Sequence, residues 1–104
     1  MSLDDNNLTG HIPDSIIHLN FLTNLDISVN NVSGNIPYNI GGLVLLENLI
    51  LSRNKLIGQI PKTVGKLKSI QIIDISNNNI FDNISNILKS VETCKNLSRV
   101  IYIQ

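Results

Sequence analysis

Cysteine, tryptophan and long apolar runs are scarce or absent in this chain. Its 104 residues include one Cys, no Trp, two Tyr and two Phe. A single Cys excludes an internal disulfide, and the shortage of aromatic residues leaves Leu and Ile to supply the core. No stretch approaches the roughly 20 consecutive apolar residues that span a bilayer, so we expect no membrane contact by this segment. Residues 1–10 lack the basic and apolar regions of a signal peptide, and the sequence contains no targeting signal.

Basic residues are missing from the first half of the chain. Residues 1–52 contain five acidic residues and no Lys or Arg, whereas residues 53–104 contain eight basic and three acidic residues. The totals cancel, which argues against nucleic-acid binding driven by bulk charge. The asymmetry is either a dipole that steers a charged partner or ordinary variation along the chain.

The chain contains an internal repeat, because an asparagine recurs along it with a period of 24. A fixed period of this length predicts a solenoid of stacked units, an architecture that usually serves as a binding surface. Apolar residues recur with the same period, and each apolar position of one unit is apolar again one and two periods later. The asparagines are Asn6, Asn30, Asn54 and Asn78, and the apolar positions of one unit are Leu22, Leu25, Ile27, Val32, Ile36, Ile40 and Leu43.

The spacing within one unit indicates the shape of a coil. Leu25 and Ile27 alternate with polar neighbours, which predicts a short strand. The later apolar spacings of four and three residues over 36–43 suit a helical or 3-10 turn on the far side. Gly34-Asn-Ile-Pro37 separates the two, where Gly permits unusual backbone angles and Pro fixes φ. We predict that the four periodic Asn side chains pair with backbone groups in the turns and form an internal ladder.

The fourth unit departs from this pattern. Asp82 and Ser85 stand where Gly and Pro would recur. The next strand pattern, Leu97–Tyr102, follows its predecessor at an offset of 27 rather than 24, which predicts one added helical turn. We therefore expect a single α/β array with the following units: 1–21 (partial), 22–45, 46–69, 70–96 (extended) and 97–104 (the start of a fifth, ending within a strand at Gln104).

Two segments, residues 25–37 and 49–61 (LILSRNKLIGQIP), resemble the plant-type leucine-rich repeat, LxLxxNxLxGxIPxxLGxLxxL. The resemblance covers nearly the whole chain, except that the fourth unit lacks Gly-x-Ile-Pro. It implies a right-handed solenoid with a parallel concave β-sheet and short helical or 3-10 returns on the convex side. Residues 87–97 are similar to the elongated, Cys-bearing repeat of phytosulfokine-receptor-like ectodomains.

Repeats of this type build the ectodomains of plant receptor kinases and kinase-lacking receptor-like proteins, and also secreted polygalacturonase inhibitors. The resemblance implies a non-catalytic module that binds a protein or peptide ligand, or a co-receptor ectodomain. It would lie on the extracellular side of the plasma membrane or in the cell wall, and no cofactor, metal or catalytic residue is expected. The alternatives are a polygalacturonase-inhibitor-like protein and a non-functional truncated remnant, since the chain resembles only part of such an ectodomain.

The resemblance also places ligand contacts on the concave face. The Asp residues at these positions belong to the consensus, whereas Val, Ile and Arg depart from it. Exposed apolar residues beside an Arg suit a peptide that carries a carboxylate or sulfate; the alternative is a face that this segment does not use. The candidate positions are Asp26, Val29, Ile50, Arg53, Ile72, Asp74 and Asn77.

Four Asn-x-Ser/Thr sequons are candidate glycosylation sites if the protein is secreted, although an Asn-rich chain also produces sequons by chance. His11 and His18 lack the neighbours of a metal site, and pairing either with Cys94 would join opposite ends of the array. Lysines cluster on the return of the third unit, which indicates a solvated convex face, with a sulfated or pectic partner as the alternative. The sequons begin at Asn7, Asn31, Asn83 and Asn96, and the lysines are Lys62, Lys66 and Lys68.

Overall fold

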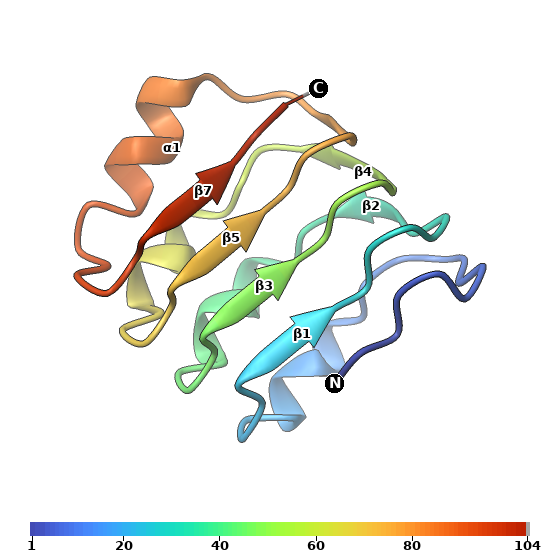
Figure 1. Cartoon of the computed structure of the whole chain (residues 1–104), viewed down its shortest axis with the longest axis horizontal. Coiled ribbons are helices and arrows are strands. Elements are labelled where there is room, and N and C mark those ends of the chain that lie inside the picture. The colour runs from blue at the N-terminus through green and yellow to red at the C-terminus, as the bar shows by residue number, and fades with distance from the viewer. Residues whose placement is uncertain (104) are drawn as a thin grey trace.

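The computed structural model describes residues 1–103 and shows stacked coils that carry two parallel sheets (Figure 1). Gln104, the predicted end of the last strand, lies outside the described residues. The four-stranded sheet has the order β1 (Asn24–Asp26), β3 (Asn48–Ile50), β5 (Ile72–Asp74) and β7 (Arg99–Ile101). The three-stranded sheet has the order β2 (Ser33–Asn35), β4 (Lys55–Gly58) and β6 (Asn79–Ile80).

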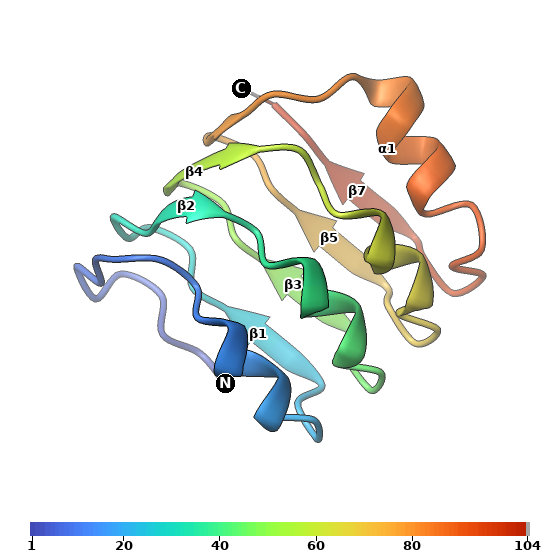
Figure 2. The same ribbon diagram turned by 180° about the vertical axis from the view of Figure 1, so that it is seen from behind.

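Short helices form the returns of the coils and cover the side opposite the four-stranded sheet (Figure 2). Three are 3-10 helices and the fourth is an α-helix. This arrangement confirms the predicted α/β solenoid with a parallel sheet and short returns. The helices are η1 (Asp14–His18), η2 (Tyr38–Gly42), η3 (Lys62–Lys66) and α1 (Ile84–Ser90).

The core lies between the four-stranded sheet and the returns, and apart from Cys94 it consists of Leu, Ile and Val. Leu49 and Ile73 from the strands and Leu67 from a return are completely buried. Cys94 is also buried; its thiol lies 3.4 Å from the carbonyl oxygen of Val64, and burial raises the pKa of the thiol. Leu and Ile therefore supply the core, as the composition predicts, and the single Cys packs as a small core residue.

The fourth coil departs from the apolar pattern that counting by 24 predicts. Ile84 and Leu88, expected in the core, are 55% and 54% exposed, whereas Ile87 is completely buried. The return of this coil is an α-helix instead of a 3-10 helix, and the different number of residues per turn brings Ile87 and the C-cap residue Val91 to the inner side and leaves Ile84 and Leu88 outside. The added helical turn is present, but it changes which residues point inward.

Strand pairing measures the length of each coil. Asn24 pairs with Asn48, a sequence offset of 24, and Ile72 pairs with Arg99, an offset of 27. The fourth coil is thus three residues longer, as the spacing predicts. In the three-stranded sheet Ser33 pairs with Lys55, an offset of only 22. Equivalent residues of successive coils are therefore in line in the first sheet and staggered in the second.

The Gly-x-Ile-Pro segments connect the second sheet to the returns. Gly34 and Gly58 have φ values of 80° and 79°, in the left-handed region that glycine enters without a Cβ penalty. Pro37 and Pro61 immediately precede η2 and η3, with φ near the helical value. In the fourth coil Asn83 is the N-cap of α1, since its side chain accepts a hydrogen bond from the backbone N–H of Asn86 (2.8 Å).

Buried Asn side chains join neighbouring coils. The Oδ1 of Asn54 accepts from the backbone N–H of Val32 (3.0 Å), and its Nδ2 donates to the carbonyl oxygens of Ile27 (3.0 Å) and Leu51 (3.2 Å). Asn30 and Asn78 make the equivalent contacts.

Asn6 is the exception among the four periodic asparagines. Its side chain is exposed and donates to the carbonyl oxygen of Asp4 (3.0 Å), within its own coil. Its backbone N–H still donates to Asn30 Oδ1 (3.0 Å). Within residues 1–103, the Asn6 side-chain amide makes its bond to Asp4 inside its own coil. The side chains of Asn30, Asn54 and Asn78 make the ladder contacts with the preceding coil, and for the Asn6 side chain the ladder role stays a prediction.

Candidate ligand-binding face

The outward side of the four-stranded sheet, which we call the β1–β7 face, is built from two rows of side chains. The middle residue of β1, β3 and β5 is buried, and its two neighbours are only partly buried. Because alternate residues of a strand point to opposite sides, these neighbours project away from the core. Strand pairing gives the rows as Asn24–Asn48–Ile72–Arg99 and Asp26–Ile50–Asp74–Ile101.

The two aspartates of this face are engaged in the turns that follow their strands. Asp26 Oδ1 accepts from the backbone N–H (3.0 Å) and the hydroxyl (2.7 Å) of Ser28. Asp74 makes the same pair of bonds with Ser76, at 3.0 and 2.6 Å. A carboxylate that bonds two residues ahead closes a local turn. Asp26 and Asp74 therefore stabilise the repeat, whatever else they contact.

Three of the predicted positions lie beyond the strands. Val29, Arg53 and Asn77 have φ values of 57°, 57° and 55°, and each is exposed. They occupy a left-handed turn at the rim of the β1–β7 face, one per coil. Asn tolerates this conformation, but for a β-branched residue such as Val it is strained. Sequence spacing did not predict this strain. The signal was that Asp5 and Asn77, two residues that tolerate left-handed backbone, occupy the same repeat position as Val29.

Isoleucines form the middle of the β1–β7 face, and an arginine lies beside one of them. Ile50 and Ile72 lie on adjacent strands, and both are partly buried. Ile101 continues one row and exposed Arg99 the other, so the sheet brings them beside the predicted positions. Sequence analysis missed Arg99 and Ile101. The offset of 27 is the signal that could have found them, since it aligns them with Ile72 and Asp74.

The His, Cys, Asp and Glu side chains of residues 1–103 are dispersed along the stack. That part of the chain contains no group of three or more His, Cys, Asp or Glu residues arranged to hold a metal ion. His11 and His18 belong to the first coil and Cys94 to the fourth, at opposite ends of the stack (Figure 1). No described helix has the length and apolar character needed to cross a bilayer.

The four sequon asparagines are exposed. Asn7 lies in a left-handed turn (φ 55°), one coil away from Asn31. Asn83 uses its Oδ1 to begin α1, so its Nδ2, the atom that carries a glycan, points elsewhere. Asn96 Nδ2 donates a long bond (3.4 Å) to the carbonyl oxygen of Lys68. Glycosylation at these positions stays a prediction.

Comparison with known proteins identifies the repeat. The Leucine Rich Repeat family model matches residues 1–19, 21–43, 45–67 and 69–91. The chain has no significant match among curated protein sequences.

Several solved structures resemble the chain. The BIR2 ectodomain of Arabidopsis thaliana is 32% identical, with a TM-score of 0.83 over 94% of this chain and 50% of that one. The BIR3–SERK2 complex of the same plant gives 29% identity and a TM-score of 0.86 over 98% and 54%. The Arabidopsis receptor kinase HAESA, solved with the peptide hormone IDA and the co-receptor SERK1, is 27% identical, with a TM-score of 0.73 over 94% of this chain and 20% of that one.

The chain thus spans about half of the first two of these proteins and a fifth of the third. Its matched segments nevertheless cover most of its own length, and each coincides with one turn of the stacked coils. The chain belongs to the leucine-rich-repeat family, and the structures it resembles are ectodomains of plant receptors.

Proposed function

We propose that this chain is a non-catalytic recognition module from the extracellular part of a plant receptor, either a receptor kinase or a receptor-like protein. Its β1–β7 face would bind a peptide or the ectodomain of a partner receptor. The observation that carries the proposal is the placement of Ile50 and Ile72 on adjacent strands, with Arg99 paired beside Ile72 and Arg53 in the turn that follows the strand of Ile50. The likeness to receptor ectodomains, one of them solved with a peptide hormone and a co-receptor, supports the same function.

The chemistry of the β1–β7 face suits an extended peptide. Ile50 and Ile72 would lose their remaining exposure to water beneath apolar side chains of the ligand, as anchor residues at the centre of an interface do. Arg53 and Arg99 would donate charge-assisted hydrogen bonds to a carboxylate or sulfate on the ligand. Neither Asp26 nor Asp74 is assigned a primary role, because each is bonded to its own turn.

The backbone at Val29 supports the same surface. A β-branched residue in a left-handed conformation costs free energy, and such strain is concentrated at functional sites. Val29 lies at the rim of the β1–β7 face, where its exposed side chain would contact a ligand that crosses from one strand to the next. We therefore include Val29 among the contact residues, despite its position outside the strand.

The proposed location is the extracellular side of the plasma membrane. Ligand binding would change how the receptor associates with its partners, and any catalytic output would come from another segment or another protein. The exposed sequons at Asn7, Asn31, Asn83 and Asn96 would then be available for glycosylation. Expression through a plant secretory pathway, followed by peptide mass spectrometry with and without an N-glycosidase, would test each sequon separately.

A display experiment tests the recognition face. A library of random linear peptides is selected against the 104-residue chain, and the affinities of the selected peptides are compared among variants. We expect Ile72→Asp and Arg53→Gln to weaken most selected peptides by about tenfold or more. Lys66→Gln, on the opposite side of the molecule, should leave them unchanged. Peptides that bind all variants equally would contradict the assignment of this face.

A further inference from the structure

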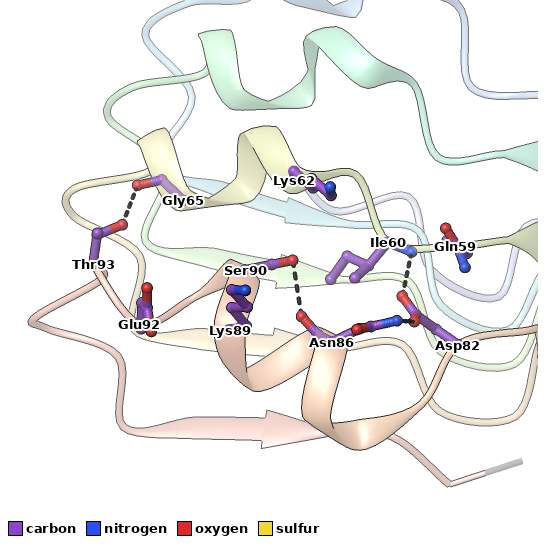
Figure 3. A pocket seen from close by; sticks show the side chains of 10 residues that line it. All are labelled: Gln59, Ile60, Lys62, Gly65, Asp82, Asn86, Lys89, Ser90, Glu92 and Thr93. Atoms are coloured by element: carbon purple, nitrogen blue, oxygen red, sulfur yellow. Dashed lines mark hydrogen bonds between the residues drawn. The ribbon is translucent and has the colours of Figure 1, made fainter.

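A cleft of about 390 Å³ lies between η3 and α1 (Figure 3). These helices are on the side of the molecule away from the four-stranded sheet (Figure 2). Hydrogen bonds connect the two walls of the cleft at both ends. At one end Asp82 Oδ2 accepts from the backbone N–H of Ile60 (3.3 Å). At the other, the hydroxyl of Thr93 donates to the carbonyl oxygen of Gly65 (2.9 Å). The separation between the walls is therefore fixed by the fold.

The cleft exists because the fourth coil packs differently from the others. Between η2 and η3 there is no room, since a Cβ at Gly41 would overlap the carbonyl oxygen of Thr63. Between η3 and α1 the backbones also come close at Gly65, where a Cβ would lie 2.8 Å from the carbonyl oxygen of Ser90. An α-helix is also wider than a 3-10 helix. The longer return thus leaves space beside η3 that the shorter returns fill.

The polar groups in the cleft differ in whether they already have partners. Asp82 is bonded to Ile60, and its second oxygen accepts from Asn83 and Asn86. Within residues 1–103, by contrast, the ammonium groups of Lys62 and Lys89 form no hydrogen bond or ion pair. They come from opposite walls, Lys62 from η3 and Lys89 from α1 (Figure 3).

The lining defines the chemistry of a ligand. Lys62 and Lys89 balance the charges of Asp82 and Glu92, so a multiply charged anion gains little net attraction. One carboxylate could accept hydrogen bonds from both lysines, while ligand hydroxyls donate to Glu92 and accept from the amide of Gln59. The lining combines these polar groups with apolar surface such as that of Ile60, which suits a ligand that has both hydroxyl groups and C–H faces, and the volume is at the lower end for small-molecule sites.

We propose that the η3–α1 cleft binds a sugar acid of about one ring, with its single carboxylate held between Lys62 and Lys89. This site is separate from the β1–β7 face and does not rest on the function proposed for that face. Lys62 belongs to the lysine cluster for which the sequence leaves a solvated face or a sulfated or pectic partner as alternatives, and the cleft adds Lys89 from the opposite wall. Lys66, on the same helix, does not line the cleft.

Nuclear magnetic resonance titration of the 104-residue chain with glucuronate tests the proposal, and glucose serves as the matched probe without a carboxylate. We expect saturable shifts of the backbone amides of Gln59, Asn86 and Thr93 with glucuronate, and at least about tenfold weaker binding of glucose. Lys62→Gln and Lys89→Gln should each weaken glucuronate binding by about tenfold, and Lys66→Gln should not. Circular dichroism verifies that each variant is folded.

Three results would overturn the proposal. One is the absence of saturable shifts with glucuronate, and another is equal binding of glucose. The third is an equal loss with Lys66→Gln, which would show that glucuronate responds to general positive charge. Arg53→Gln should leave glucuronate binding unchanged while it weakens peptides on the β1–β7 face. Failure at one site is therefore distinguishable from failure at the other.

Discussion

The inner coils, residues 22–69, and the outer coils on either side of them have the same fold but hold it in different ways. In the inner coils, backbone preferences and buried amides fix the shape: Gly34 and Gly58 adopt left-handed φ values, and Asn54 bridges two coils. In the fourth coil the corresponding turn has Asp82 and is held by Tyr102. The Tyr102 hydroxyl accepts from the backbone N–H of Asp82 (3.2 Å) and lies 2.8 Å from its carbonyl oxygen.

This comparison shows that one turn can be specified by local or by distant residues. A glycine needs no partner to enter the left-handed region, so an inner turn is encoded within a few residues. The turn at Asp82 depends on a residue 20 positions later. We expect the fourth coil to lose its shape when that distant residue is changed, whereas a coil with a glycine at this turn responds mainly to changes within its own repeat.

The largest effect should follow from removal of an inner amide. Asn54→Ala leaves the backbone N–H of Val32 and the carbonyl oxygens of Ile27 and Leu51 without this partner in the core. We expect a loss of about 4 kcal/mol in the free energy of unfolding, measured by urea denaturation. Asn6→Ala is the matched control and should cost less than about 0.5 kcal/mol, because that side chain is exposed. Similar losses for both would remove the distinction between inner and outer coils.

The next effect concerns the packing of the returns. Gly41→Ala places a methyl group against the backbone of Thr63 and should cost about 3 kcal/mol by thermal or chemical unfolding. Gly10→Ala is its outer-coil counterpart, since nothing lies within 4 Å of a Cβ there. Its cost should be only the left-handed backbone penalty, about 1 kcal/mol. A smaller loss for Gly41→Ala than for Gly10→Ala would show that the inner returns are loosely packed.

A smaller loss is expected from the hydroxyl that holds the fourth coil. Tyr102→Phe removes the hydrogen-bond partner of the Asp82 backbone N–H and should cost about 1.5 kcal/mol. Amide hydrogen exchange should become faster at residues 80–83 while the inner coils keep their protection. Tyr38→Phe is the control, because Tyr38 is 72% exposed. Uniform acceleration along the whole chain would contradict a local role for Tyr102.

The smallest expected effect has the opposite sign. Val29→Asn relieves the left-handed strain of a β-branched residue and should raise the free energy of unfolding by about 1 kcal/mol. The reciprocal change in the fourth coil, Asn77→Val, should lower it by a similar amount. Peptides selected on the β1–β7 face should bind Val29→Asn more weakly if Val29 is a contact residue. A gain in both stability and affinity would contradict the role proposed for Val29.

The period of the chain was sufficient to predict much of this structure. Because equivalent places in the coils recur with that period, the strands around Leu25 and Leu49, the buried Asn54 and the glycine turns follow from counting. Counting also predicts the longer fourth coil. It cannot predict which side of α1 is buried, since the helical period, not the repeat, brings Ile87 inward.

The candidate site was less predictable than the fold. Val29 and Arg53 are not residue types that favour left-handed backbone, so the coil imposes this conformation on them. Among the residues at the same repeat position, only Asp5 and Asn77 favour it. Arg99 joins the β1–β7 face because strand pairing brings β7 beside β5. The η3–α1 cleft arises from a difference between two returns, and a single repeat contains no trace of it.

The different offsets of the two sheets have a consequence for any extended ligand that crosses the coils. On the β1–β7 face a straight path from β1 to β5 meets the same repeat position each time, because the offset is 24. On the second sheet the offset is 22, so a straight path moves back by two repeat positions, or about 7 Å along the strand, at each coil. The two sheets of one molecule therefore present equivalent residues at different positions along a straight ligand. A ligand with identical side chains at regular intervals would match the first sheet and fall out of step on the second.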